Sequence, residues 1–383
     1  MLGDRALFPR LAARVYVNHC GISPPSVRVI EAVAAVLEDY ATHGVMAHLR
    51  WRDQREVLRG RLAGLIGASP GDIAFMPNTT SGVIAVAQCL PWRRGDRVLL
   101  FEGEFPTNIT PWQQAAAENG LELVWAPPGD VGRVEEELRR GVRLVALSAV
   151  QFQTGLRMPW EHISALCEAH GAELFVDGIQ ALGVVPLDVG AIDYLACGSH
   201  KWLMGIEGAG FLYVAPHRAP TLRPRLAGWL SHEDAARFLL DGPGHLRYDR
   251  PLKRTAAVFE GGAQNAAGLA ALDAAAQLIE GLGPAAIFDH VQRWHDLLEP
   301  AMVARGFTSL RAPDHGARSG ILSFLPPPGV RVQDLLRGLA TQGIAVSIPD
   351  GVLRFGPHWP NGHHEPALVV EALDALTAGG PPG

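Results

Sequence analysis

From residue 73 onward, short and continuously apolar runs alternate with longer stretches that carry apolar residues at helical spacing. The short runs are typical of buried strands, and the stretches between them are long enough to form helices. Strands that are apolar throughout are covered on both faces, so this alternation predicts a mainly parallel sheet between two layers of helices. The pattern predicts strands near residues 73–76, 97–101, 121–126, 143–150, 173–176, 192–196 and 210–214. It predicts helices near residues 29–40, 47–66, 79–89, 110–118, 131–140 and 160–170.

The pattern changes after the last of these strands. Residues 216–258 are rich in Pro, Arg and Gly and have no clear period, so we expect an irregular segment there. Helices near 265–279 and 284–305 follow, and the remaining residues alternate again as a smaller α/β unit. A chain of 383 residues is long enough for two domains. We therefore predict an N-terminal arm (1–15), a large domain (16–280) and a small C-terminal domain (281–383).

An acidic residue and a lysine follow two of the predicted strands. Asp177 comes directly after the run 173–176, and Lys201 lies five residues after the run 192–196. Ligands bind at the carboxyl ends of the strands in parallel sheets, so both side chains are expected at one sheet edge. The chain has 33 Lys+Arg but only two lysines, Lys201 and Lys253. A buried amine can lose its proton and form a Schiff base, which guanidinium cannot do, so Lys201 is a candidate nucleophile.

Three other strand ends carry residues with possible binding roles. Thr79 and Thr80 open a helix, where they would bind a phosphate or belong to an N-cap; from this motif alone capping is favoured. Phe105 would either stack on a flat ring or pack in the core. Gln151 would either touch a ligand or cap a loop. Taken together, a phosphate-binding turn, an aromatic ring, a carboxylate and a lysine at one sheet edge describe a site for pyridoxal phosphate.

Composition narrows the function classes. The net charge of −6 argues against a nucleic-acid partner. The four cysteines form no CxxC pair, and His358, His363 and His364 lack the spacing of a helix-borne metal motif, so we expect neither a disulfide framework nor a metal site. The glycines of residues 205–210 precede a strand instead of opening a helix, which argues against a dinucleotide site and a dehydrogenase. The sequence has no apolar run of membrane-spanning length and no leader, so we expect no membrane association and a cytoplasmic location.

The sequence resembles the class V aminotransferase and cysteine desulfurase family of fold-type I pyridoxal-phosphate enzymes over nearly the whole chain. The most specific blocks are residues 176–183 (VDGIQALG) and 199–202 (SHKW). The resemblance implies a large domain with a mainly parallel seven-stranded sheet sandwiched by helices, and a smaller C-terminal α/β domain. It also implies a homodimer with the active site at the subunit interface.

The resemblance further implies roles for residues around the cofactor, pyridoxal 5′-phosphate. Lys201 would hold the cofactor as a Schiff base and then act as base and acid at the substrate Cα. Asp177 would pair with the pyridine nitrogen, Gln180 would contact the phenolic oxygen, and Phe105 would stack on the ring. The implied phosphate-binding residues are Thr79 and Thr80, with Ser199 and His200 nearby.

The substrate side of the site combines implied roles and departures from the family pattern. Arg354 would grip the α-carboxylate of an amino-acid substrate, and Asn18 and Gln151 are further substrate-binding candidates. Phe152 stands where desulfurases have an Asn, so Gln151 or its neighbour is a candidate substitute. Desulfurases also need a nucleophilic cysteine late in the chain, and no cysteine follows Cys197, which argues against that activity.

The sequence leaves the reaction type open. We expect an aminotransferase, with a C–S β-elimination lyase and an amino-acid epimerase of the isopenicillin N epimerase-like group as alternatives. A binding protein that keeps the fold without the chemistry is a further alternative. The retention of Asp177, Lys201 and Arg354 together speaks against it.

Overall fold

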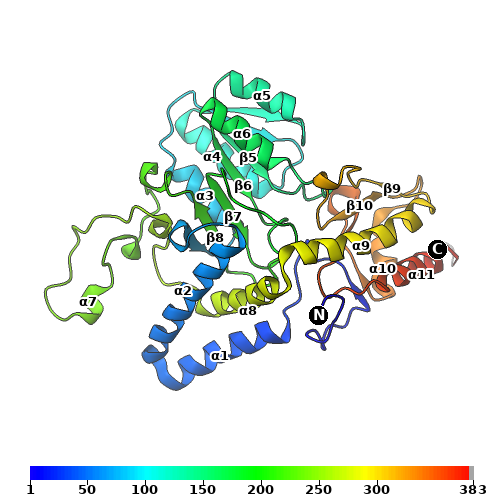
Figure 1. The fold of residues 1–383 in the computed structure, drawn as a ribbon, viewed down its shortest axis with the longest axis horizontal. Helices are drawn as coiled ribbons and strands as arrows, with labels where there is room; N and C mark the ends of the chain where they lie inside the picture. The colour runs from blue at the N-terminus through cyan, green and yellow to red at the C-terminus, as the bar shows by residue number, and fades with distance from the viewer. Residues whose placement is uncertain (379–383) are drawn as a thin grey trace.

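A seven-stranded sheet with the order β2-β8-β7-β6-β5-β3-β4 forms the centre of the larger unit in the computed structural model, which describes residues 1–378 (Figure 1). Strand β8 runs antiparallel to its neighbours β2 and β7, and all other neighbouring pairs are parallel. The predicted fold class is therefore confirmed. The strands are β2 (Ile73–Met76), β3 (Arg97–Phe101), β4 (Glu122–Ala126), β5 (Val142–Ser148), β6 (Glu173–Asp177), β7 (Tyr194–Gly198) and β8 (Gly210–Val214).

Helices cover both faces of this sheet because its strands are apolar on both sides. Helices α3 (Thr79–Cys89) and α4 (Thr110–Asn119) pack on one face, where Trp112 and Phe175 are completely buried. The other face carries a second apolar cluster that includes residues of α2, α5, α6 and α8. The remaining helices of this unit are α1 (Val27–His43), α2 (Ala47–Leu65), α5 (Val131–Arg139), α6 (Trp160–His170) and α8 (Ala266–Leu282).

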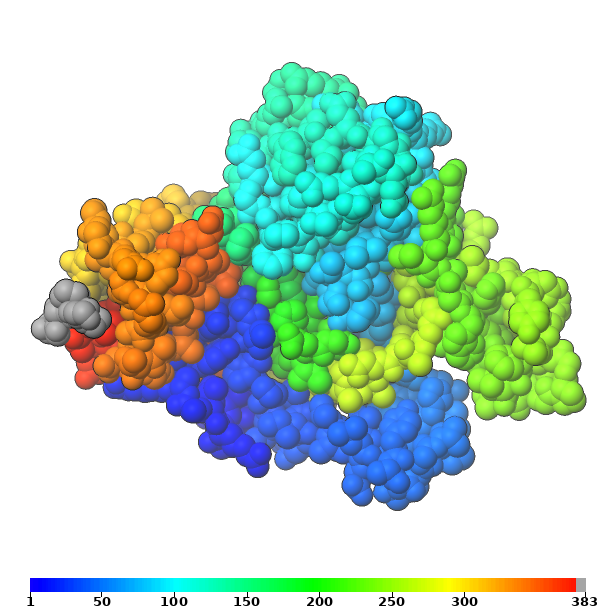
Figure 2. All heavy atoms as spheres, turned by 180° about the vertical axis from the view of Figure 1, so that it is seen from behind, coloured from blue at the N-terminus to red at the C-terminus, as the bar shows by residue number. Residues whose placement is uncertain are grey.

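The segment between β8 and α8 is irregular, as the sequence predicts. Apart from short 3₁₀ turns, the described chain forms only the four-residue helix α7 (Arg237–Leu240) there. The segment projects away from the body of the molecule and carries α7 near its tip (Figures 1 and 2).

The C-terminal unit contains a three-stranded antiparallel sheet of order β12-β10-β9. The N-terminal strand β1 (Val15–Tyr16) pairs in parallel with β11 (Ile344–Ala345), and Val15 and Val17 are buried among the core residues of this unit. The N-terminal segment is thus tied to the C-terminal unit, while the exact domain boundaries stay predictions. The other elements are α9 (Pro284–Val303), β9 (Thr308–Ser309), β10 (Leu322–Leu325), α10 (Val332–Thr341), β12 (Leu353–Phe355) and α11 (Glu365–Ala378). No helix among residues 1–378 combines the length and apolarity needed to cross a membrane.

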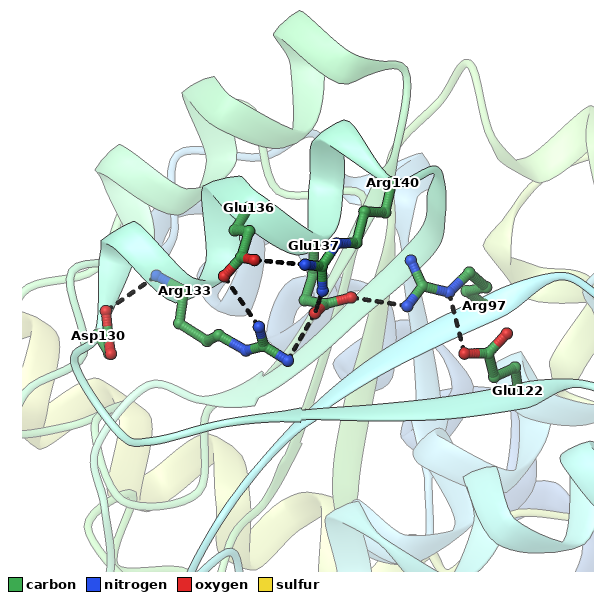
Figure 3. Close-up of polar contacts among 7 residues, drawn as sticks. All are labelled: Arg97, Glu122, Asp130, Arg133, Glu136, Glu137 and Arg140. Carbon is green, nitrogen blue, oxygen red and sulfur yellow. Dashed lines mark hydrogen bonds and ion pairs between the residues drawn. The ribbon is translucent and has the colours of Figure 1, made fainter.

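A buried glutamate anchors α5 beside the edge of the sheet. Glu137 is 1% exposed and pairs with Arg97 of β3 and with Arg133 and Arg140 at the two ends of the same helical stretch (Figure 3). Burial alone would raise the pKa of Glu137, but the hydrogen bond from Arg97 and the surrounding arginine charges outweigh it and lower the pKa. The helix is therefore fixed to the strand through charge as well as apolar packing.

The register of the central strands brings the candidate site residues to one edge. Ser148 of β5 lies opposite Asp177 of β6, and Asp177 lies opposite Ala196 of β7. The loops that leave β6 and β7 then touch each other at Gly183. This glycine has φ +107°, and a Cβ there would lie 2.2 Å from the carbonyl oxygen of Trp202. A glycine is required because the backbone must approach this closely beside Lys201.

Replacing this glycine tests that contact. Gly183→Ala would place a methyl group against the Trp202 carbonyl in a backbone region that costs other residues about 1–3 kcal/mol before any clash. We expect a loss of unfolding free energy of at least that size, measured by urea denaturation. Gly60→Ala is the control, because Gly60 lies within α2 with no atom near its missing Cβ and should be neutral or stabilised. Equal stability of the two variants would contradict the assigned contact.

Candidate active site

Asp177 ends β6 with its carboxyl group in the interior. It is 2% exposed, and Oδ1 accepts a hydrogen bond from the backbone N–H of Ile179 at 2.9 Å. Within residues 1–378, Oδ2 has no hydrogen-bond partner. Burial raises the pKa of Asp177 to about 6, although the Ile179 N–H and the charge of Lys201 pull it downward. This oxygen is therefore available to a cationic or hydrogen-donating group.

Lys201 lies three residues beyond the end of β7, and its backbone is held firmly. The hydroxyl of the buried residue Ser23 donates to the carbonyl oxygen of Lys201 at 2.6 Å. Its Nζ lies 5.5 Å from the centre of the Phe105 ring and makes no hydrogen bond with the described residues. Burial lowers the pKa of Lys201, and the charge of Arg354 lowers it further, while Asp177 opposes both. The amine is thereby shifted toward its nucleophilic, uncharged form.

The start of α3 forms a small polar cradle next to Lys201. Asn78 is the N-cap and accepts from Ser81 N–H, so the capping alternative for this motif is correct for Asn78. Thr79 accepts a hydrogen bond from the N–H of Gly198 at 2.9 Å. A Cβ at Gly198 would lie 3.3 Å from Thr79 Oγ1 and 3.4 Å from His200 Nδ1. Thr79 and His200 are thus brought together around a residue without a side chain.

Thr80 and Ser199 occupy different places around this cradle. The hydroxyl of Thr80 pairs with that of Thr107 at 2.9 Å, so it lies at the accessible edge of the helix start. Ser199 is completely buried, and its hydroxyl donates to the carbonyl oxygen of Ile206. The Ser199 hydroxyl therefore closes the turn that follows Lys201 and is engaged there.

Gln180 and Asn18 lie on the side of the site that faces the N-terminal segment. The Gln180 amide donates to Cys20 O at 3.0 Å and accepts from Trp202 Nε1 at 2.8 Å. Asn18 forms an isolated bridge with Gly356, which directly follows β12 and lies two residues after Arg354. Gln180 thus joins the loop that carries Lys201 to the N-terminal segment, and Asn18 lies beside the strand of the proposed carboxylate-binding arginine.

Arg354 presents a buried cation from the C-terminal unit. It is 6% exposed; Nε donates to Ser347 Oγ at 3.0 Å and Nη1 donates to the carbonyl oxygen of Phe152 at 2.6 Å. Its Nη2 has no partner, and the guanidinium forms no ion pair among residues 1–378. A buried cation without a counter-ion favours an anionic ligand. Because its charge affects Lys201, that ligand would lie next to the amine.

Gln151 is used within its own loop. Its Nε2 donates to Gly103 O and to Gln153 Oε1, and its Oε1 accepts from Gln153 and Thr154. These contacts favour the loop-capping alternative over direct substrate binding. The adjacent Phe152 packs edge-on against Phe105 with the ring centres 5.3 Å apart.

Glu104 is a site residue that the sequence analysis did not single out. Its carboxyl group accepts hydrogen bonds from Ser148 N at 2.6 Å and from the Ser148 hydroxyl. Burial raises the pKa of Glu104 to about 7, and the neighbouring charge of Asp177 adds to the increase. The available signal was its position after β3, directly before Phe105.

An aspartate and a lysine at strand ends of the seven-stranded sheet, together with an arginine from the C-terminal unit, are typical of a fold-type I enzyme site of the pyridoxal-phosphate class. The model for the family "Aminotransferase class-V" matches residues 15–352, which is most of the chain. The chain belongs to this family, whose members use pyridoxal phosphate. The resemblance drawn from the sequence is thereby confirmed.

Individual relatives span nearly the same length but carry different activities. The chain is 25% identical to "Uncharacterized aminotransferase YcbU" of Bacillus subtilis, over 97% of each chain. It is 30% identical to isopenicillin N epimerase of Streptomyces clavuligerus, over 83% of each. Among solved structures, the apo cysteine desulfurase of Thermococcus onnurineus NA1 superposes with a TM-score of 0.83 at 25% identity, over 95% of each chain. A C-DES mutant with glycine covalently linked to the PLP cofactor reaches 0.86 at 25% identity, over 97% of this chain and 99% of that one.

The cost of burying Asp177 gives a pH-dependent prediction for the cofactor-free protein. Its folded pKa of about 6 lies above the ordinary 3.8, so its ionisation destabilises the fold as the pH rises through 6. Asp177→Asn should therefore be more stable than wild type at pH 8, by up to about 3 kcal/mol, with a smaller gap at pH 5. Urea unfolding at both pH values measures this, with Asp53→Asn at an exposed position as the control. If Asp177→Asn is less stable than wild type at pH 8, the ionised form of Asp177 does not destabilise the fold.

Proposed function

We propose that the chain is a pyridoxal-phosphate-dependent aminotransferase that acts on an α-amino acid. The observation that carries the proposal is the convergence of Lys201, Asp177 and Arg354, in which a half-buried amine lies within electrostatic reach of both a buried carboxylate and a buried guanidinium. Each of the three keeps at least one polar atom without a hydrogen bond to residues 1–378. Buried polar groups of this kind need partners, and cofactor and substrate together supply them.

The residues present fit the cofactor's phosphate, ring nitrogen and aldehyde, whereas both ends of the Gln180 amide are engaged by Cys20 and Trp202 and leave the phenolic oxygen without an assigned partner. Thr79 and His200 both lie next to Gly198 at the start of α3, and a helix N-terminus with its free N–H groups suits a phosphate group. Oδ2 of Asp177 would hold the proton of the ring nitrogen, and the Phe105 ring would cover one face. When bound, pyridoxal phosphate supplies an aldehyde for an amine and a ring that withdraws electrons from the substrate Cα.

Residues of the chain itself would bind the substrate and transfer the proton. Lys201 would hold the aldehyde group of the cofactor, and its Nζ, when free, would be able to take the proton from the substrate Cα. Arg354 holds the α-carboxylate and so fixes the direction of the Cα–H bond. The other lysine, Lys253, donates to the Leu230 carbonyl and is engaged elsewhere. A single amine base removes and returns protons on one side, which supports transfer over epimerisation, a reaction that needs acid–base groups on both faces.

A lyase is the main alternative outcome of the same first step. The sequence has no cysteine after Cys197, so the late nucleophile expected of a desulfurase is absent. β-Elimination needs only Lys201 as the base and a substrate with a leaving group, so the experiment must distinguish products.

The proposed function predicts a coloured protein and a keto-acid product. Wild type incubated with pyridoxal phosphate should turn yellow, and Lys201→Ala should lose the visible absorbance because no amine remains to hold the aldehyde. When wild type is incubated with a panel of L-amino acids, amino-group transfer would abolish the yellow colour. It would release a keto acid and leave the amino group on the cofactor. Release of pyruvate with ammonia or sulfide would establish a lyase instead, and formation of D-amino acid an epimerase. A wild type that takes up no cofactor would remove the basis of the proposal.

The carboxylate-binding role of Arg354 has its own test. Arg354→Gln should keep the yellow colour but lower kcat/KM roughly 10- to 150-fold, because a charge-assisted hydrogen bond contributes about 1.5–3 kcal/mol. Arg337→Gln removes a charge from an exposed position of α10 and should change nothing. If the kcat/KM of Arg354→Gln equals that of wild type, another residue must bind the substrate α-carboxylate.

We further infer that the enzyme is a homodimer. The projecting segment exposes Trp229 (48%), Leu239 (61%), Leu240 (68%) and Tyr248 (88%), a density of apolar side chains that is unusual for a free surface. A cavity of about 340 Å³ also opens between the end of β2 and residues 259–265, close to the start of α3. Both features support an interface that covers the phosphate side of the site.

If the enzyme is a homodimer, light scattering should give twice the mass of one chain. Leu240→Glu would place a charge in the interface and shift the mass toward one chain at low concentration. The exposed Leu325→Glu in the C-terminal unit serves as the control and should leave the mass unchanged. A wild type with the mass of one chain would contradict the inference.

A further inference from the structure

Glu104 places a second carboxyl group near Asp177, with Ser148 between the two. It follows β3, yet its side chain crosses to the end of β5, where Oε1 accepts from Ser148 N at 2.6 Å and Oε2 pairs with the Ser148 hydroxyl. Ser148 is in turn the register partner of Asp177 on the adjacent strand. One buried serine therefore separates the two carboxyl groups.

No basic side chain compensates Glu104. Among residues 1–378 it forms no ion pair, and the groups that face it are Ser148 of β5, Asp177 of β6 and the amide of Asn108 in the 3₁₀ turn that follows. Burial raises the pKa of Glu104 to about 7, the hydrogen bonds from Ser148 lower it, and the charge of Asp177 raises it again. Two carboxyl groups in this arrangement do not ionise independently, because the charge on one disfavours the charge on the other.

We propose that Glu104 is a positioning residue of the cofactor site, which holds Ser148 at the end of β5 and releases its proton when a cation is placed beside Asp177. This inference rests on the proposed binding of pyridoxal phosphate. It assigns to Glu104 a function that the fold alone does not require, since a glutamine could make the same two contacts with Ser148.

The direction of the proton follows from charge. In the cofactor-free protein, burial and, to a lesser extent, the charge of the ionised Asp177 favour the protonated form of Glu104, which pairs with Ser148 at the end of β5. A protonated ring nitrogen next to Asp177 cancels most of that negative potential, so the Glu104 carboxyl group gives its proton to water and becomes a carboxylate. The new charge then lies behind Asp177 and stabilises the ring proton. Glu104 also precedes Phe105, whose ring faces Lys201 Nζ, so the same residue fixes the wall of the site.

The proton count on cofactor binding tests the proposal. Titration calorimetry of pyridoxal phosphate into the cofactor-free dimer or monomer, in buffers of different ionisation enthalpy at pH 7, gives the protons exchanged per chain. With a pKa of about 7, Glu104 is about half protonated at this pH, so wild type should release up to about half a proton more than Glu104→Gln. Glu102→Gln is the matched control, because Glu102 is exposed two residues away and should give the wild-type count.

Each result decides between distinct possibilities. Equal proton counts for wild type and Glu104→Gln would overturn the role of Glu104 while leaving cofactor binding intact. Absence of any binding by wild type would instead refute the proposed function. If Glu104→Gln does not fold, the infrared band of protonated carboxyl groups in wild type supplies the test. The band should lose intensity at pH 7 when pyridoxal phosphate is added, and an unchanged band would overturn the proposal.

Discussion

The placement of a carboxylate and an amine at the ends of two adjacent parallel strands is the constraint on which the rest of the structure depends. β6 and β7 are hydrogen-bonded neighbours, so Asp177 and the loop that carries Lys201 leave the sheet side by side. Both groups are removed from water, and each shifts the pKa of the other toward the charged form. Burial has the opposite effect and dominates in both. Burial and the neighbouring charge therefore have opposing effects on the pKa of each group, and the site keeps both groups near the protonation states in which they can react.

Much of the surrounding structure holds these two groups in place. Ser23 binds the Lys201 carbonyl, Gln180 joins Trp202 to the N-terminal segment, and Gly183 lets the two strand-end loops touch. Ser199 closes the turn after the lysine. These residues contact the backbone and one another more than they contact the open site. A nucleophile on a loop needs such support because the loop itself has no ladder of hydrogen bonds.

The parts of the fold that depend on apolar pattern could be predicted from the sequence, whereas side-chain direction could not. Continuous apolar runs predicted the seven strands. Asp177 was recognisable because it directly follows one of them, and Lys201 because it lies shortly after the next and is one of only two lysines. Gln151 and Ser199 have suitable chemistry in suitable places, but their polar atoms are consumed by Gly103 O and Ile206 O, contacts that no local pattern encodes. Glu104 was missed for the converse reason. Its partner Ser148 is 44 residues away, and only the pairing of β3 with β5 brings them together. The strand β1 joined the C-terminal unit because its partner β11 lies at the other end of the sequence.

Under the proposed function, the residue that would bind the substrate lies in a different part of the molecule from the residues that would hold the cofactor. Arg354 belongs to β12 of the C-terminal unit, yet its guanidinium donates to Phe152 in the loop after β5. Ser323 donates to the carbonyl of Gln153 in the same loop, so two strands of the smaller sheet fix it. Under the proposed function, a substrate carboxylate on Arg354 would bind where the two units meet. The orientation of the bonds at the substrate Cα would then be set at this junction, whereas Asp177 and Lys201 would hold the cofactor.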